Sequence, residues 1–190
     1  MGVRIRADEA PAFVRSRLAG LAGTRWVGID GKGASGKTTL AAAVAAVLAD
    51  AVVVHVDDFA RPSVDTWERD RFVAQVLAPS RAGRPARYER WDWASDASAG
   101  WSEVPVGVPV VVEGVSSTDV RLGVPWDVTL WVDVPAQVRL ARALARDGEA
   151  MREQWVERWM PAEDAYEAAQ RPQDRVDAVV VPPLLRRSIG

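Results

Sequence analysis

The 190-residue chain contains no cysteine, no asparagine and only one histidine, His55. The absence of cysteine excludes disulfide scaffolds, thiolate zinc sites and cysteine nucleophiles, and it fits a reducing compartment. A single histidine excludes multi-histidine metal sites, and the absence of asparagine excludes a guanine-reading N-K-x-D motif. No apolar run reaches the roughly 18 residues that a bilayer span requires. The first ten residues carry four charges and lack an apolar core. We therefore expect a cytoplasmic protein with no secretory signal and no membrane contact.

Lysine is nearly absent as well, because only Lys32 and Lys37 are lysines among 24 basic residues. Both lie in one glycine-rich segment, which indicates a local need for a compact ammonium on a flexible stem. The net charge of −2 gives no basic field for nucleic acid. The remaining composition, 48% hydrophobic and 26% charged, is that of a globular chain, and the length predicts one domain over residues 1–190.

Strand and helix patterns alternate along the chain. Apolar runs predict strands at 25–30, 51–56, 108–113, 128–133 and 176–181. Helical spacing predicts helices at 8–21, 37–49, 66–77, 136–146 and 152–170. We interpret residues 78–105, rich in proline, glycine and tryptophan, as irregular. The alternation predicts an α/β fold with a five-stranded parallel sheet between two layers of helices.

The glycine-rich segment Gly31–Thr38 reads G-K-G-A-S-G-K-T and matches G-x-x-x-x-G-K-[ST] between a predicted strand and a predicted helix. Glycines let backbone N–H groups converge on phosphate oxygens, and the helix N-terminus adds partial positive charge. Lys37 would reach the β- and γ-phosphates, and the Thr38 hydroxyl would coordinate Mg²⁺. The predicted ATP-binding residues are Gly31, Lys32, Gly33, Ala34, Ser35, Gly36, Lys37, Thr38 and Thr39.

Carboxylates lie at the ends of three of the predicted strands, at the sheet edge where α/β proteins bind ligands. Asp57 and Asp58 follow one strand, Glu113 ends another, and Asp133 ends a third, where we expect it to be a structural cap. Asp57 could accept or orient the proton of a substrate hydroxyl, and Glu113 is placed to hold Mg²⁺ or its waters. The alternative for each is a solvated or capping carboxylate. We expect His55 to pack against a neighbouring helix.

Arg139, Arg142 and Arg146 share one face of a predicted helix that ends before Gly148. Guanidinium groups on such a segment suit a short lid around residues 146–153 that closes on a triphosphate. A solvated face paired with nearby acids is the alternative. An apolar helix face serves a core or a homo-oligomer interface equally well, so the oligomeric state stays open.

Six segments together resemble the uridine kinase-like branch of P-loop kinases, which includes relatives of phosphoribulokinase and pantothenate kinase. They lie in family order over most of the chain, at 31–39, 56–61, 110–115, 139–147, 159–166 and 177–181. The resemblance implies a nucleoside-monophosphate-kinase-like sheet, ATP as donor and Mg²⁺ as cofactor. It also implies that Asp57 is the base, that Glu113 lies near Mg²⁺, and that Arg142 and Arg146 touch the donor phosphates.

The segment after the base motif departs from uridine kinases, because 61–68 reads R-P-S-V-D-T-W-E and keeps only Asp65 and Trp67 of the family pattern. Aromatic and basic residues on the acceptor-side segment 61–101 could stack on a base or meet an anion. The predicted acceptor contacts are Asp58, Arg61, Tyr88, Arg90, Trp93 and Arg139. We expect Trp155 and Trp159 to be core residues.

These observations lead to one leading hypothesis and two alternatives. The leading hypothesis is an ATP-dependent kinase for a small-molecule hydroxyl, nucleosides first, in which Asp57, Lys37, Arg142 and Arg146 carry the chemistry and Thr38, Glu113 and Asp57 lie at the metal. The first alternative is a kinase for a non-nucleoside alcohol, such as a pantothenate-like compound, a sugar or an antibiotic. The second is an ATP-binding switch that makes no product.

Overall fold

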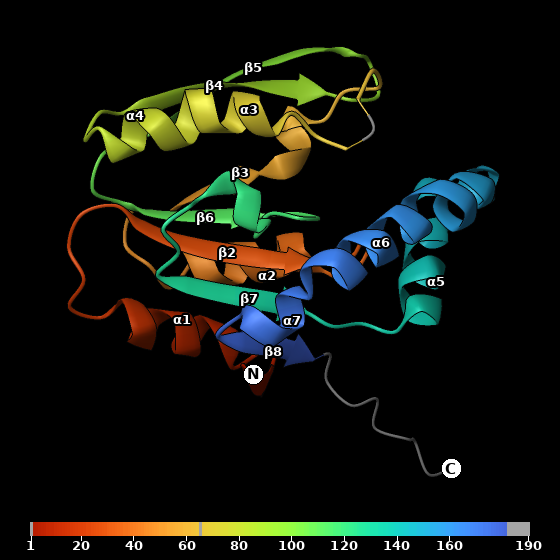
Figure 1. Ribbon diagram of the computed structural model, residues 1–190, viewed down its shortest axis with the longest axis horizontal. Coiled ribbons are helices and arrows are strands. Elements are labelled where there is room, and N and C mark those ends of the chain that lie inside the picture. Colours follow the sequence, from red (N-terminus) through yellow and green to blue (C-terminus); the bar gives the residue numbers. More distant parts are fainter. Residues whose placement is uncertain (1, 65, 182–190) are drawn as a thin grey trace.

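The protein is described by a computed structural model that covers residues 2–64 and 66–181. Its centre is a parallel sheet of six strands in the order β1-β8-β7-β2-β6-β3 (Figure 1). The strands are β1 (Val3–Arg6), β2 (Arg25–Gly31), β3 (Val52–His55), β6 (Pro109–Glu113), β7 (Val128–Val132) and β8 (Ala178–Val181). The predicted α/β class is confirmed. The sheet has six strands instead of five, because β1 pairs with β8 at the edge.

Two apolar cores cover the two faces of the sheet. Strand residues alternate between them: Val27 and Ile29 face one core, whereas Trp26 faces the other. The first core lies under α1 (Ala10–Leu18) and α2 (Lys37–Ala45). The second core lies under α3 (Arg69–Phe72), which continues through a π-helical turn (Val73–Leu77) into α4 (Ala78–Arg81). Because β2, β6 and β7 are buried on both faces, they read as continuous apolar runs.

The segment predicted as irregular contains an antiparallel hairpin, so that prediction is wrong. The hairpin strands are β4 (Ala86–Asp92) and β5 (Ala97–Val104), and their register shifts between Glu89 and Trp91. Only Ala86 and Tyr88 of β4 are buried, and the other positions are half-buried or exposed. The hairpin packs against the second core, where the Tyr88 and Phe59 rings stack with centroids 5.2 Å apart.

The C-terminal third supplies the remaining helices around the sheet's carboxyl edge (Figure 1). They are α5 (Ala136–Asp147), α6 (Met160–Gln170) and α7 (Pro172–Arg175). Between α5 and α6 lie a 3₁₀ turn (Glu149–Met151) and a π-helical stretch (Gln154–Trp159). Further 3₁₀ turns follow β3 (Val56–Phe59) and precede β7 (Val120–Leu122). Within the described ranges no helix is both long and apolar enough to cross a membrane.

Candidate active site

The loop between β2 and α2 takes backbone conformations that glycine accommodates best. Gly31 has φ 148° and Gly36, at the N-cap of α2, has φ 97°. A Cβ added to Gly33 would lie 2.5 Å from Glu163 Oε1 and 2.7 Å from the Trp155 ring. The glycines of the motif therefore allow both the turn itself and the close approach of α6 and its preceding π-helical stretch.

A buried ion pair supports this loop from α5 and α6. Glu163 accepts a hydrogen bond from the Gly33 amide at 2.8 Å and pairs with Arg139 Nη1 at 2.8 Å. Arg139 also approaches the Gly33 carbonyl at 3.4 Å. Burial raises the pKa of Glu163, although the Gly33 amide and Arg139 oppose that shift. Arg139, predicted to contact the acceptor, is 2% exposed and is used here to hold the loop.

The two lysines of the motif have different environments. Lys32 points to α6, where its Nζ lies 2.5 Å from both Asp164 and Glu167. Lys37 is buried at the start of α2 and donates from Nζ to the Lys32 carbonyl at 2.8 Å. Burial lowers the pKa of Lys37, against the opposing charge of Glu113. Lys37 therefore lines the cleft, whereas Lys32 anchors the loop to a helix.

Glu113 joins the loop to the end of β3. Its Oε1 accepts from the Thr38 hydroxyl at 3.0 Å and lies 2.6 Å from His55 Nδ1. The bond to Glu113 raises the pKa of His55. The His55 ring, which we expected to pack against a neighbouring helix, also lies at hydrogen-bond distance from this carboxylate. A hydroxyl and a carboxylate are hard oxygen donors, so Thr38 and Glu113 fit Mg²⁺, which keeps several waters and phosphate oxygens as its other ligands.

Asp57 and Asp58 follow β3 and point to different surroundings. Asp57 faces the open cleft, where loss of hydration and the charge of Glu113 raise its pKa. Asp58 accepts from the Tyr88 hydroxyl at 3.2 Å, and its backbone carbonyl accepts from Arg71 at 2.9 Å. Only Asp57 is therefore presented to a ligand, whereas Asp58 joins the turn to the hairpin.

A cleft of about 990 Å³ runs over the loop and the carboxyl ends of the strands. Many predicted site residues line it: Gly33, Ala34, Gly36, Lys37, Thr38, Thr39, Asp57, Trp93, Glu113, Arg142 and Arg146. Arg142 approaches the Ser35 carbonyl at 3.5 Å, and Arg146 lies 2.6 Å from Asp147. Most of the predicted ATP-binding residues, together with Asp57, Glu113, Arg142 and Arg146, thus line one cavity.

Most predicted acceptor contacts do not line the cleft. Among the described residues, the lining lacks five of the six predicted acceptor residues, namely Asp58, Arg61, Tyr88, Arg90 and Arg139. It also lacks three of the predicted ATP-binding residues, Gly31, Lys32 and Ser35. Arg61 lies 3.8 Å over the Trp91 ring and pairs with Glu68 at 2.8 Å. Arg90 donates to the Ala99 carbonyl within the hairpin. Trp67 is buried and lines the cleft, whereas Asp65 lies outside the described residues.

Three tryptophans form an aromatic wall of the cleft. Trp93, on the hairpin turn, meets Trp159 edge to face with centroids 6.4 Å apart, and Trp159 meets Trp155 at 4.8 Å. Trp155 is 5% exposed, as expected for a core residue, but both Trp155 and Trp159 also face the cavity. Their i, i+4 spacing was consistent with either role.

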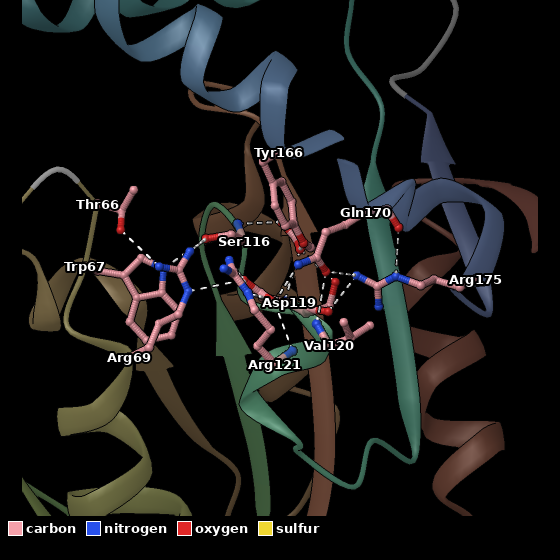
Figure 2. A network of polar contacts seen from close by, with 12 residues as sticks. Thr66, Trp67, Arg69, Ser116, Asp119, Val120, Arg121, Tyr166, Gln170 and Arg175 are labelled. Atoms are coloured by element: carbon pink, nitrogen blue, oxygen red, sulfur yellow. Dashed lines mark hydrogen bonds and ion pairs between the residues drawn. The ribbon is translucent and has the colours of Figure 1, made fainter. Parts of the chain in front are cut away.

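Besides Glu163, sequence reasoning missed two buried carboxylates. Asp30, directly before Gly31, accepts from the Ser116 amide at 2.9 Å, the Thr118 hydroxyl at 2.7 Å and the Tyr166 hydroxyl at 2.6 Å. The position of Asp30 at the end of a predicted strand could have indicated this role. The other is Asp119, the centre of the polar network in Figure 2. It lies after β6 in a stretch with no motif to mark it.

Comparison with known proteins supports the fold and gives local sequence similarity to a kinase. No family model matches the chain. A solved chain assigned as a fructose transport system kinase from Silicibacter sp. TM1040 aligns with TM-score 0.75 and 22% identity, over 92% of this chain and 98% of that one. A solved chain from Bacillus stearothermophilus, described as a possible uridine kinase, aligns with TM-score 0.67 and 20% identity, over 92% and 97%.

A nicotinamide riboside kinase from Eremothecium gossypii is 55% identical over 49 residues, which span 24% of this chain and 20% of that protein. The chain therefore matches about a fifth of the length of this curated relative. The parallel sheet, the glycine-rich loop and the cleft above it define an α/β fold with a candidate phosphate-binding site. More narrowly, the structural neighbours confirm the predicted resemblance to uridine kinase-like P-loop kinases at the level of the fold.

Proposed function

We propose that the protein transfers the γ-phosphoryl group of ATP to a hydroxyl of a small molecule. The observation that supports this most strongly is that Lys37, Glu113 and Asp57 line one cleft. Phosphoryl transfer requires mainly positioning and charge stabilisation from the protein, and this cleft supplies both. The local similarity to nicotinamide riboside kinase makes a nucleoside the first acceptor class to test.

Each residue has a defined task in this proposal. Asp57 orients the acceptor hydroxyl and takes its proton, and a raised pKa suits a carboxylate that acts as a base. Lys37, Arg142 and Arg146 offset the charge on the transferring phosphoryl group. Thr38 and Glu113 would hold Mg²⁺, which supplies charge neutralisation between the β- and γ-phosphates. The loop amides and the N-terminus of α2 bind the donor.

The segment around residues 146–153 is proposed as a short lid. Gly148 has φ 91° between α5 and the 3₁₀ turn, and Arg146 precedes it on the cleft side. Trp155 donates to Asp147 at 2.9 Å, so the position of the pair Arg146–Asp147 depends on the aromatic wall. Closure of this segment would exclude water from the reacting phosphate.

The experiment is ADP release, measured with Mg²⁺ and ATP across nucleosides, sugars and vitamin-like alcohols. We expect release to depend on one acceptor class, with nucleosides first. Stimulation by sugars or vitamin-like alcohols and not by nucleosides would favour the non-nucleoside kinase. An ATP-binding switch would release ADP at the same rate whatever the alcohol, and that result would contradict the proposal.

A further inference from the structure

The loop after β6 carries a polar network at the wall of the cleft (Figure 2). Its centre is Asp119, which is 0% exposed. Arg121 binds the Asp119 carboxylate through Nε at 3.0 Å and Nη2 at 2.5 Å, and Arg69 Nε lies 3.3 Å from it. Gln170 of α6 donates to the same carboxylate at 2.7 Å. One buried carboxylate therefore fixes two guanidinium groups from separate elements.

Both arginines line the cleft, and their remaining donors are available to a ligand. Arg121 keeps 67% of its side chain exposed, and its Nη1 makes no hydrogen bond among the described residues. Arg69 is held more tightly: it donates to the Thr66 hydroxyl and the Ser116 hydroxyl, each at 3.1 Å, and its guanidinium lies 5.2 Å from the Trp67 ring. Its Nε is buried without a hydrogen bond.

Ser116 completes this wall with a donor of its own. Its hydroxyl oxygen accepts from Trp67 Nε1 at 3.0 Å and from Arg69 Nη2 at 3.1 Å, so the hydroxyl proton stays free for a third partner. Ser116 has φ 61°, an uncommon conformation for a serine, which the Asp30 carboxylate fixes through the Ser116 amide. The side chain is buried except toward the cleft.

The charges of the network do not balance. Burial disfavours ionisation of Asp119, but hydrogen bonds from Arg121 and Gln170 outweigh it and lower its pKa to about 2. Asp119 therefore stays ionised and offers one negative charge to two guanidinium groups. Because two guanidinium groups share this carboxylate and present oriented N–H donors to the cleft beside the Ser116 hydroxyl, the wall matches an oxyanion.

On the basis of the proposed kinase function, we propose that the acceptor is an acidic alcohol whose carboxylate or phosphate binds to Arg69, Arg121 and Ser116. Asp119 is the positioning residue that sets the orientation of both guanidinium groups. Lys37, Arg142 and Arg146, by contrast, are left for the donor phosphates. The cleft would then select its acceptor by charge at this wall as well as by shape at the tryptophans.

The first test does not require the acceptor to be known. The donor site is filled with Mg²⁺ and a non-hydrolysable ATP analogue, and the protein is titrated calorimetrically with inorganic phosphate and, separately, with glycerate. We expect millimolar binding of at least one anion, weakened at least ten-fold in Arg121→Gln and largely rescued in Arg121→Lys. Arg81→Gln is the matched control, because Arg81 contacts the Gly123 carbonyl beside this loop but lies outside the cleft lining.

The second test uses acceptor pairs that differ in one anionic group: ribose 5-phosphate with ribose, gluconate with glucitol, and nicotinic acid riboside with nicotinamide riboside. We expect the member of a productive pair that carries the phosphate or carboxylate to have the higher kcat/KM, and Arg121→Gln to remove that preference through KM. The phosphate and carboxylate pairs distinguish the two sources of the oxyanion.

The two tests can contradict the anion subsite and the proposed kinase function independently. Binding of neither anion, equal binding by Arg121→Gln, or binding only when the donor site is empty would overturn the anion subsite. A preference for the members without the phosphate or carboxylate that Arg121→Gln leaves unchanged would do the same. If at least one anion binds as expected but no alcohol stimulates ADP release, the kinase proposal fails and the subsite stands.

Discussion

The phosphate-binding loop and the β4–β5 hairpin contribute to the same cleft, but different forces hold them. The loop is fixed by a buried ion pair, Arg139–Glu163, which comes from helices more than a hundred residues further along the chain. The hairpin is fixed by stacking of Tyr88 on Phe59 and by Arg71, which donates to the Glu89 carbonyl at 2.6 Å. The donor side is therefore held by charge across distant segments, and the acceptor side by local aromatic packing.

The largest expected effect is on kcat, and it tests whether the ATP phosphate and the acceptor hydroxyl come together at Asp57. Asp57→Asn removes the proton acceptor but keeps the size of the side chain, so we expect kcat to fall by about 10²- to 10⁴-fold. ATP affinity should be preserved, because the loop is untouched. Steady-state kinetics and calorimetric titration with the ATP analogue measure the two quantities. Undiminished turnover would remove Asp57 from the reaction.

The second prediction concerns the rigidity of the donor side. Glu163→Ala leaves Arg139 buried without its partner and removes the acceptor of the Gly33 amide, which we expect to destabilise the fold by about 3–5 kcal/mol. Urea denaturation measures this change. Glu149→Ala is the control, because its pair with Arg152 is exposed and should contribute no measurable stability. Similar urea midpoints for Glu163→Ala and Glu149→Ala would contradict the claim that the buried ion pair holds the loop.

The third prediction concerns the acceptor side alone. Trp93→Ala removes the edge-to-face contact with Trp159, and such contacts contribute about 0.5–1.5 kcal/mol. We expect KM for the acceptor to rise roughly 2- to 13-fold with KM for ATP unchanged. Trp101→Ala is the matched control, because Trp101 is exposed on the same hairpin and does not line the cleft. A rise in KM for ATP would show that the aromatic wall serves the donor.

The smallest effect is a stability change that depends on pH. The pKa of Asp57 is higher in the folded protein than in the unfolded chain. The protonated carboxyl is therefore compatible with the fold at a pH below the unfolded pKa, and the free energy of unfolding falls as pH rises through the folded pKa and the side chain ionises. Asp57→Asn should therefore melt slightly higher than the parent at pH 7 without nucleotide, and the difference should be small because Asp57 is exposed and solvent screens its charge. Scanning calorimetry from pH 7 down to pH 3 should show the difference vanish.

The glycine-rich loop and the hairpin also differ in how far they could be predicted from the sequence. The loop, its flanking strand and helix, and the carboxylates Asp57 and Glu113 follow from short motifs and apolar periodicity. β1 could not be predicted, because four residues reading V-R-I-R at a sheet edge are barely apolar. The hairpin was hidden by its charged outward positions and by the register shift near Trp91.

Site residues that depend on tertiary contacts were beyond any local pattern. The pairing of His55 with Glu113 joins two neighbouring strands, and its geometry appears only when the sheet is assembled. Arg139 shares its helix face with Arg142 and Arg146, and only the position of Glu163 separates its role from theirs. The donor arginines and the supporting arginine therefore look alike in sequence and differ in structure.

The segment from Ala60 to Val104, which includes the β4–β5 hairpin, is inserted between β3 and β6, two strands that lie side by side in the sheet. Because the chain leaves the sheet after β3 and returns at the neighbouring β6, this segment could be replaced without a change in the order of the sheet strands. A grafted segment would need to retain Arg71, whose Nη2 donates to the Asp58 carbonyl next to Asp57, the proposed base. If the proposed function holds, other alcohols could then be tested as acceptors without any change to the glycine-rich loop.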